Sequence, residues 1–429
     1  MKRGSLVGVV PAAALLVLAL VAAARRLGRP PPSTIASSTA MTSADAPATS
    51  AAGLEAPLRA APDASLPDAS GIVASPRMLH GAATHVHRAA AHGPTTIKQR
   101  WRVEVGGPVA AQVTVSPDER TLYVATLAGA VVALQRNDGV RAWTSQLTEK
   151  TERVYSAPLV ADDGTLFVGT DAKKLVALDP KGVVRWRLEV DGEADTAPVF
   201  GPNGLVVFAA GNAVYAARRA GDLAWRFATK GKVFTSPAIT ADGHVIVGSQ
   251  DDHVYCIGQD GALVWSVDLG ADVDGVPAVA DDGALYVGTD KGEIVRLDGK
   301  GNIVWRTAVG GFVRGPLTIA RDGDVLAGTY GPVPRVVRLS PAGMIRGAFA
   351  IRGTGAREFG IHGGPLEDSA GTLYFGTQDD AVYAITRSGE RLFRFETRGD
   401  VDAPLTMLGD GSLVVASEDG TVTLLAAGD

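Results

Sequence analysis

Short apolar runs separated by turn-forming residues fill the chain from about residue 98 to its end. One unit shows the pattern: Val154–Val160 is apolar, Thr165–Thr170 alternates, Leu175–Leu178 is apolar again, and Val183–Leu188 contains a tryptophan. Runs of about four to eight residues bounded by Asp, Gly and Pro are typical of β-strands, and this region shows no helical periodicity. The pattern predicts an all-β fold built from units of four short strands.

The four-strand unit repeats about every 40 residues. Six tryptophans stand at the same place in successive units, at intervals of 39–43 residues: Trp101, Trp143, Trp186, Trp225, Trp265 and Trp305. An Asp-Gly pair recurs between the first and second strands, as in Asp163-Gly164 and Asp282-Gly283. Because this pair accepts the positive φ angles of a tight hairpin turn, we expect neighbouring strands to be antiparallel.

Four antiparallel strands in about 40 residues are typical of a β-propeller blade. Eight first strands follow one another, beginning near Val109, Val154, Ala194, Val233, Val273, Val313, Ile361 and Val401. In the last two units Gly347 and Phe393 stand where the others have tryptophan. We therefore expect an eight-bladed propeller over residues 97–429. Its blades should be packed together by Trp101, Trp143, Trp186, Trp225, Trp265, Trp305 and Phe393, since such side chains bury large areas.

The two ends of the repeat region are each incomplete. The chain stops at Leu424–Ala427, after only three strands of the eighth unit, and it begins with a lone tryptophan-bearing strand at Lys98–Val105. We expect strand 98–105 to pair as the outermost strand of the last blade. Such closure joins the two ends and leaves no open edge in the ring.

The N-terminus carries a targeting segment. Met1-Lys2-Arg3 precedes an apolar run from Leu6 to Ala24, which is followed by two arginines. Residues 1–26 fit either a cleaved signal peptide or an N-terminal membrane anchor, because the run of residues 6–24 is also about long enough to span a bilayer. Both readings predict an exported protein, periplasmic or associated with the cell envelope.

Residues 27–96 are rich in Ala, Pro, Ser and Thr and contain almost no aromatic residues. Such a segment buries too little apolar surface to offset the entropy of ordering, so we expect a disordered linker. Four histidines lie in its last stretch: His80, His85, His87 and His92. Their spacing matches no rigid metal site, and we expect no bound metal.

Charge and cysteine content exclude several classes of protein. The chain has 41 Lys and Arg against 46 Asp and Glu, and the basic residues do not cluster, which argues against a nucleic-acid partner. The single cysteine, Cys256, excludes an intrachain disulfide. It occupies a position that holds alanine in other units, so we expect a buried, inert thiol.

The repeat resembles the PQQ-like (pyrroloquinoline-quinone-like) propeller family. The segment from Ala177 to Trp186, Ala-Leu-Asp-Pro-Lys-Gly-Val-Val-Arg-Trp, is similar to the family's Ala-x-Asp-x-x-x-Gly-x-x-x-Trp docking pattern, and Arg296–Trp305 is a weaker copy. The resemblance covers about residues 98–429. Within the family, the size and layout are most similar to the eight-bladed scaffold of outer-membrane protein assembly, although the chain lacks the lipidation cysteine of that scaffold.

Candidate binding residues precede the recurring proline of each first strand. They differ from blade to blade while their surroundings repeat, as expected of positions that face a ligand in the channel or at its rim: Tyr155, Asp195, Phe234, Asp274, Arg314, His362 and Asp402. The alternative is a water-filled channel whose polar lining satisfies itself. No residue is assigned a catalytic, cofactor-binding or metal-binding role.

The resemblance implies two classes of function. One is a non-enzymatic envelope platform that binds another envelope protein or an extended peptide as a monomeric propeller. The other is a quinoprotein dehydrogenase that uses PQQ and Ca²⁺ to oxidise an alcohol or a sugar. The family's dehydrogenases commonly use adjacent cysteines and long insertions, whereas this chain has one cysteine and only one longer interval, at residues 352–359. We therefore expect the platform, with no cofactor.

Overall fold

Among the residues that the structure describes, the apolar and alternating runs form 32 short β-strands and two single-turn 3-10 helices, η1 (Leu79–Gly81) and η2 (Pro202–Gly204). The structure is a computed structural model that describes residues 76–149, 151–356 and 359–428. The predicted signal peptide or anchor at residues 1–26, its apolar run 6–24, and residues 27–75 of the predicted linker lie outside the described residues. Within the described residues, no helix has the length and apolar character to cross a bilayer.

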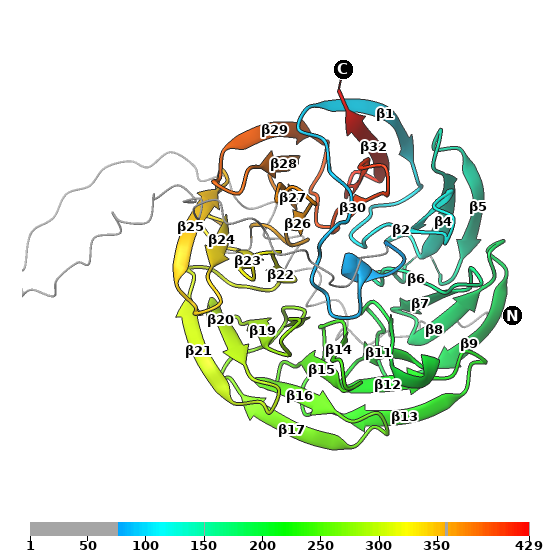
Figure 1. The fold of residues 1–429 in the computed structure, drawn as a ribbon. Helices are drawn as coiled ribbons and strands as arrows, with labels where there is room; N and C mark the ends of the chain where they lie inside the picture. The colour runs from blue at the N-terminus through cyan, green and yellow to red at the C-terminus, as the bar shows by residue number, and fades with distance from the viewer. Residues whose placement is uncertain (1–75, 150, 357–358, 429) are drawn as a thin grey trace, which may run out of the picture. The chain divides into compact units, whose positions relative to one another are not determined.

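The described strands form eight sheets of four antiparallel strands each, which confirms the prediction of an eight-bladed propeller (Figure 1). Blades 1–4 consist, from the inner to the outer strand, of β2 (Thr114–Val115), β3 (Thr121–Ala125), β4 (Ala130–Gln135) and β5 (Arg141–Gln146); β6 (Leu159–Val160), β7 (Leu166–Thr170), β8 (Lys174–Leu178) and β9 (Val184–Glu189); β10 (Val199–Phe200), β11 (Val206–Ala210), β12 (Ala213–Ala217) and β13 (Leu223–Ala228); β14 (Ala238–Ile239), β15 (Val245–Gly248), β16 (His253–Ile257) and β17 (Leu263–Asp268).

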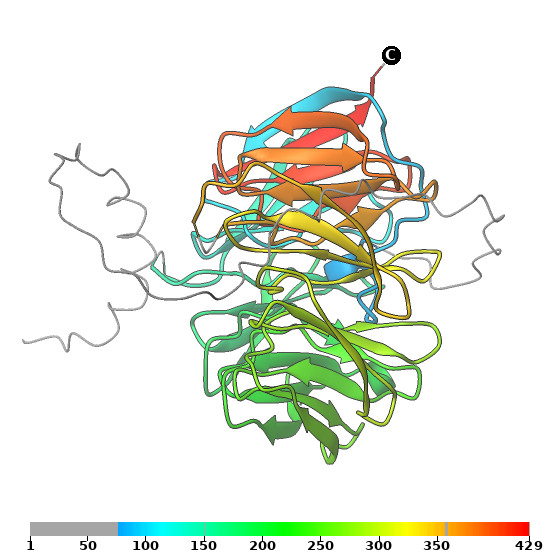
Figure 2. The same cartoon turned by 90° about the vertical axis from the view of Figure 1, so that its left-hand side faces the viewer.

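Blades 5–8 follow the same order around the ring. They consist of β18 (Ala278–Val279), β19 (Leu285–Gly288), β20 (Glu293–Leu297) and β21 (Ile303–Ala308); β22 (Thr318–Ile319), β23 (Val325–Gly328), β24 (Arg335–Leu339) and β25 (Ile345–Ala350); β26 (Leu366–Glu367), β27 (Leu373–Thr377), β28 (Ala381–Ile385) and β29 (Arg391–Glu396); β30 (Thr406–Met407), β31 (Leu413–Ala416), β32 (Thr421–Ala427) and β1 (Ile97–Glu104). Figure 2 shows the blades edge-on, stacked face to face around the ring.

The first strand of the propeller completes the last blade, as predicted. β1 pairs antiparallel with β32, with Trp101 opposite Leu424 and Glu104 opposite Thr421. The strand begins at Ile97 and ends at Glu104, one residue earlier at each end than predicted. In Figure 1 the two ends of the propeller lie side by side in this blade. A ladder of backbone hydrogen bonds between β1 and β32 therefore closes the ring.

Each tryptophan contacts the turn of the next blade. The indole Nε1 atoms of Trp101, Trp143, Trp186, Trp225, Trp265 and Trp305 donate to the carbonyls of Arg136, Pro180, Arg219, Gln259, Gly299 and Pro341, respectively, at 2.8–3.2 Å. The ring of Trp143 lies against Gly182, whose φ is 81° and whose Cβ, if present, would fall 2.5 Å from that ring. Glycine is therefore required in this turn by both its backbone angle and the close approach.

The two blades without tryptophan use phenylalanine. Phe349 of β25 packs edge-on against Phe375 and Tyr383 of blade 7, with ring centroids 6.0 Å apart in each pair. Phe393 of β29 lies 6.3 Å from Tyr374, centroid to centroid. Gly347, which stands where other units have tryptophan, pairs with Arg338 of the neighbouring strand β24. That guanidinium belongs to a buried ion-pair network, so a different interaction holds this part of the ring.

The hydrophobic core lies between blades. The middle strands are buried on both faces, as in β7 and β11, because each blade is covered by a neighbour on either side. The outer strands alternate, with β9 half-buried at every second residue. Cys256 lies in β16 and is buried, and burial raises the pKa of its thiol to about 12. The thiol is therefore protonated and unreactive at neutral pH.

The tryptophan contacts differ in burial, which predicts a graded effect of their removal. Trp101 is 9% exposed and bridges the closing blade to blade 1, whereas Trp265 is only partly buried. We expect Trp101→Ala to lower the free energy of unfolding by about 3–5 kcal/mol, since it leaves a cavity at the closure. Trp265→Ala is the matched control and should have a smaller effect. Equal losses in denaturant unfolding would contradict this role of the closure.

Candidate functional site

The seven candidate residues gather at one end of the inner strands. Each lies in the loop that leads into its inner strand, about four residues before it, and not on the strand itself as the sequence suggested. Tyr155 precedes β6, Asp195 precedes β10, and the same holds for Phe234, Asp274, Arg314, His362 and Asp402 in the later blades. We call this the entry end of the inner strands. The last residues of the inner strands form the opposite, exit end.

Most of the candidates pair with a residue of the preceding blade. Arg314 donates to Asp290 at 2.7–3.1 Å, Gln250 donates to Asp274 at 3.3 Å, and Gln378 donates to Asp402 at 3.1 Å. His362 bonds Tyr330, the Asp195 carboxyl interacts with that of Asp171, and Tyr155 accepts a bond from Arg153. The lining is thus a set of polar pairs, most of them between neighbouring blades. Phe234 differs, because it is exposed with the Lys232 ammonium over its ring.

Two acidic members of this set, Asp195 and Asp274, have pKa values shifted toward the protonated form. Burial and the neighbouring Asp171 raise the pKa of Asp195 to about 8, and burial raises the pKa of Asp274 to about 6. A carboxyl in a low-dielectric site next to a second carboxyl holds its proton, because the two cannot both ionise at low energy. Among the described residues, no group of His, Cys, Asp and Glu side chains is arranged to hold a metal ion.

At the exit end, the chain's own residues 76–91 run across the centre of the ring; we call them the plug. Figure 1 shows this segment in blue inside the ring. Carbonyls of the plug accept hydrogen bonds at 2.8–3.3 Å from the last residue of six inner strands: Pro76 from Val115, Arg77 from Val160, Ala83 from Ile239, Thr84 from Val279, Val86 from Ile319, and His87 from Glu367. The prediction of a disordered linker over residues 27–96 is therefore wrong for residues 76–96.

Three histidines of the plug are fully buried and contact one another. The ring of His80 stacks on that of His87, with centroids 4.1 Å apart, and meets His85 edge-on at 5.6 Å. His85 and His87 each place Nε2 on a backbone carbonyl, of Pro237 at 2.9 Å and of Leu405 at 3.3 Å. All three have positive φ, of 49–56°, a conformation that non-glycine residues adopt only where their surroundings hold it.

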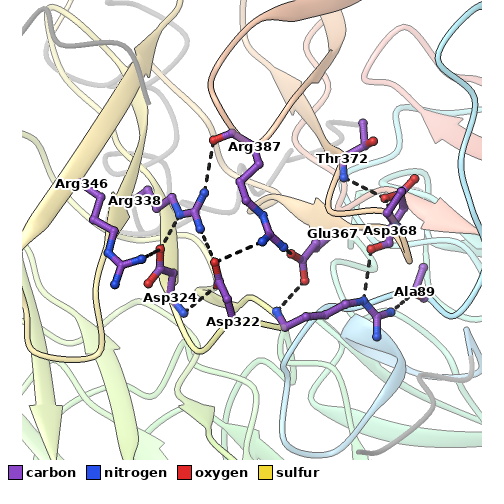
Figure 3. A network of polar contacts seen from close by, with 11 residues as sticks. Ala89, Asp322, Asp324, Arg338, Arg346, Glu367, Asp368, Thr372 and Arg387 are labelled. Atoms are coloured by element: carbon purple, nitrogen blue, oxygen red, sulfur yellow. Dashed lines mark hydrogen bonds and ion pairs between the residues drawn. The ribbon is translucent and has the colours of Figure 1, made fainter. Parts of the chain in front are cut away.

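A buried ion-pair network stands beside the plug (Figure 3). Arg338, 2% exposed, donates to the fully buried Asp324 at 2.5 Å and also bonds Asp322. Arg387 connects Asp322 to Glu367 at 3.4 and 3.3 Å.

The network reaches the plug through blade 7. The Glu367 carboxylate accepts a bond from the Arg321 amide at 2.8 Å, and the Arg321 guanidinium donates to the Ala89 carbonyl. The Ala89 amide in turn donates to the Glu367 carbonyl at 2.8 Å. Charged groups of blades 6 and 7 therefore fix the last part of the plug.

Sequence reasoning missed both the plug and this network. The amino-acid composition changes little at residue 76, so composition did not indicate that residues 76–96 are ordered. The available signal was the appearance of Met78, Leu79 and Val86 among the histidines after a stretch poor in large side chains. The charges of Asp322, Arg338 and Glu367 look like ordinary surface charges in the sequence, because burial of an ion pair depends on how neighbouring blades pack.

The raised pKa of Asp195 predicts a pH effect on stability. The folded protein holds a proton that the unfolded chain loses above about pH 4, so stability falls as pH rises to about 8. Asp195→Asn removes this loss, so its free energy of unfolding relative to wild type should be greater at pH 8 than at pH 6.5, by about 2 kcal/mol. Asp274→Asn is the control: its advantage should stop growing near pH 6. Parallel urea-unfolding curves across this pH range would contradict the assignment.

The ion-pair network predicts that removing the Arg338 guanidinium has a large effect on the stability of the protein. Arg338→Met leaves Asp324 buried with less compensating charge, and we expect a loss of about 3–5 kcal/mol in the free energy of unfolding. The matched control is Arg185→Met. The Arg185 side chain is 45% exposed and pairs with Asp163 at 3.6 Å, so its removal should lower the free energy of unfolding by less than about 1 kcal/mol. Chemical denaturation measures both, and a small effect at Arg338 would mean that the network does not stabilise the ring.

Comparisons with solved structures show the fold. The crystal structure of BamB from Moraxella catarrhalis superposes with a TM-score of 0.64 at 20% identity, over 77% of this chain and 100% of that chain. Quinohemoprotein alcohol dehydrogenase from Comamonas testosteroni gives a TM-score of 0.68 at 14% identity, over 82% of this chain and 80% of that chain. At these identities the likeness concerns the fold alone.

Sequence comparisons point to one family. The outer membrane protein assembly factors BamB of Escherichia coli K12 and Salmonella typhimurium LT2 are each 28% identical over 116 residues, which is 25% of this chain and 29% of theirs. The chain thus matches less than a third of the length of these relatives. A family model described as outer membrane protein assembly factor BamB matches residues 85–163, 151–251, 215–282 and 250–340, together more than half of the chain. The chain therefore belongs to the PQQ-like β-propeller family of the outer membrane protein assembly factor BamB.

Proposed function

We propose that the protein is a non-enzymatic propeller of the cell envelope that binds protein partners and takes part in outer-membrane protein assembly. Family membership carries this proposal, because the matched relatives are named as assembly factors for outer-membrane proteins. The protein would be exported through residues 1–26 and either released or held by residues 6–24. The propeller would act as a monomer, since β1 closes the ring within one chain.

Exposed apolar side chains on the outer strands supply a surface for partners. They stand at the start of the outer strands of blades 2–6, and we call them the apolar rim: Val183, Leu223, Leu263, Val264, Ile303, Val304, Met344 and Ile345. In blades 4 and 5, two consecutive residues are exposed, by 40–51%. Figure 1 places these strands at the circumference of the ring.

The outer strands also offer backbone groups. A strand at the edge of a sheet has one row of unpaired N–H and C=O groups, which an extended peptide can join by adding a strand. Apolar side chains next to such an edge add affinity by burial. An extended segment of an envelope protein is therefore the partner that the rim of blades 4 and 5 fits best.

The second candidate is a PQQ-dependent dehydrogenase. The fold likeness to quinohemoprotein alcohol dehydrogenase favours it, but the arrangement of polar residues supports the platform. Most candidates at the entry end are engaged with a neighbouring side chain, as Arg314 is with Asp290 and Asp402 with Gln378, and so do not converge on a common ligand.

The apolar rim gives a direct test of the platform. In a host strain that lacks the gene, the wild-type gene should restore the amount of folded outer-membrane β-barrel proteins, measured by heat-modifiable migration in gels. Ile303→Asp with Val304→Asp should fail to restore it. Val333→Asp, an exposed apolar residue between β23 and β24 that belongs neither to the apolar rim nor to the entry-end candidates, is the control and should restore it fully. Full activity of the rim variant would exclude this surface, and no effect of the gene would refute the assembly role.

The dehydrogenase has its own test. Purified protein is mixed with PQQ and Ca²⁺, and its absorbance spectrum and melting temperature are recorded. We expect neither to change. A stable spectral shift, followed by reduction of a dye in the presence of an alcohol or a sugar, would establish the dehydrogenase instead.

A further inference from the structure

The plug is bound mainly through its backbone. It bonds six of the eight inner strands, and in each case the donor is the amide of the strand's last residue. The inner strand of a blade pairs with a second strand on only one side, so its other edge faces the centre of the ring. Hydrogen bonds from such edges to the backbone carbonyls of a bound segment do not depend on the side chains of that segment. The exit end therefore has the chemistry of a polypeptide-binding site.

Side chains of the plug fill the spaces between blades. Leu79 joins the core between blades 1 and 2, Met78 that between blades 2 and 3, Ala83 that between blades 3 and 4, Val86 that between blades 5 and 6, and Ala89 that between blades 7 and 8. A cavity beside His80 and His87 measures about 20 Å³, room for about one water molecule. This fit identifies residues 76–91 as the resident occupant of the site.

The centre of the plug is suited to neutral histidines only. Both ring nitrogens of His80, and Nδ1 of His85 and of His87, are buried without a hydrogen-bond partner among the described residues. Burial lowers the pKa of His85 and of His87 to about 4, and burial with the two neighbouring histidines lowers the pKa of His80 well below its ordinary value. A proton on any of these rings would place a charge in a low-dielectric site.

The charged groups around the plug are already engaged with one another. Within the plug, Arg77 pairs with Asp162 and Arg88 with Asp281. From blades 6 and 7, Arg321, Asp322, Arg387, Glu367 and Asp368 face its last part. Glu367 accepts bonds from Arg321 and Arg387, Asp322 pairs with Arg338 and Arg387, and Asp368 pairs with His92. The acidic groups next to the plug are therefore committed to other cations.

We propose that the exit ends of the inner strands form a binding site for a polypeptide segment, that residues 76–91 hold this site at neutral pH, and that protonation of His80, His85 and His87 releases them in mild acid. The sign follows from linkage. Each pKa is lower in the docked plug than in a released one, so the released state binds more protons below about pH 6.5. Docking is complete at pH 7.5 and weakens as pH falls from 6.5 toward 4.

The extent to which acid weakens docking of the plug follows from the pKa values of His85 and His87. A histidine with a pKa of about 4 when docked and about 6.5 when released weakens docking roughly tenfold at pH 5.5. His85 and His87 together weaken it roughly a hundredfold, and His80 adds to this. No outer strand carries a comparable group, so the loss should be confined to the plug and the amides it covers.

Amide hydrogen exchange of the full-length protein, read by mass spectrometry at pH 7.5 and 5.5, tests this proposal. After correction for intrinsic rates, protection of the plug and of the Val160, Ile239 and Val279 amides should fall at least a hundredfold at pH 5.5. Amides of β8 and β9 should keep their protection. Unchanged protection of the plug in the wild-type protein would overturn the proposal.

Two variants assign the effect to the buried rings. The double variant His85→Gln with His87→Gln keeps a side-chain N–H for the Pro237 and Leu405 carbonyls but cannot be protonated, so it should lose most of the pH dependence. His92→Gln, one residue beyond the plug and 60% exposed, is the matched control and should behave as wild type. A loss of amide protection at pH 5.5 that is as large in the double variant as in wild type would also overturn the proposal. The outcome concerns the plug and is independent of the assembly role.

Discussion

The contact between an outer-strand tryptophan and the glycine turn of the next blade holds most of the ring together. It combines a hydrogen bond from the indole with a flat apolar contact that only glycine permits at the turn. The contact steps from one blade to the next, so it links neighbouring blades at six of the eight junctions of the ring. Trp101 makes the same contact from the closing strand, so the closure uses both the backbone pairing with β32 and this side chain.

The closure also explains how the chain can plug its own ring. β1 lies on the circumference, yet the residues before it cross to the centre, where they bond the ends of six inner strands. The network from Arg338 to Glu367 stabilises the side of the ring where the plug leaves for β1, and Arg321 bonds the plug there. Residues 76–96 are therefore part of the folded propeller, and residues 76–91 fill the part of the channel at the exit end.

The sequence predicted the repeat well and the site poorly, for physical reasons. Blade number, strand order and the closing strand depend on local patterns, such as Asp163-Gly164 and the tryptophan period, which each unit repeats. The seven entry-end candidates do lie together at one end. Most of their partners come from the preceding blade, as Asp290 does for Arg314. Which side chains meet across two blades depends on how the blades pack, and the sequence of neither blade shows this. The sequence did not predict the plug, because its short apolar and histidine side chains are buried only by contact with the rest of the ring.

The central claim of this account is that residues 76–91 are an integral, buried part of the native propeller. The most direct measurement is the rate of tryptic cleavage after Arg88, whose side chain is buried in the ring. The full-length protein is digested at pH 7.5, and the rate is compared with that of global unfolding. The account predicts that cleavage at Arg88 is no faster than unfolding and accelerates with denaturant in the same way. Rapid cleavage at Arg88 while the rest of the propeller stays folded would contradict it.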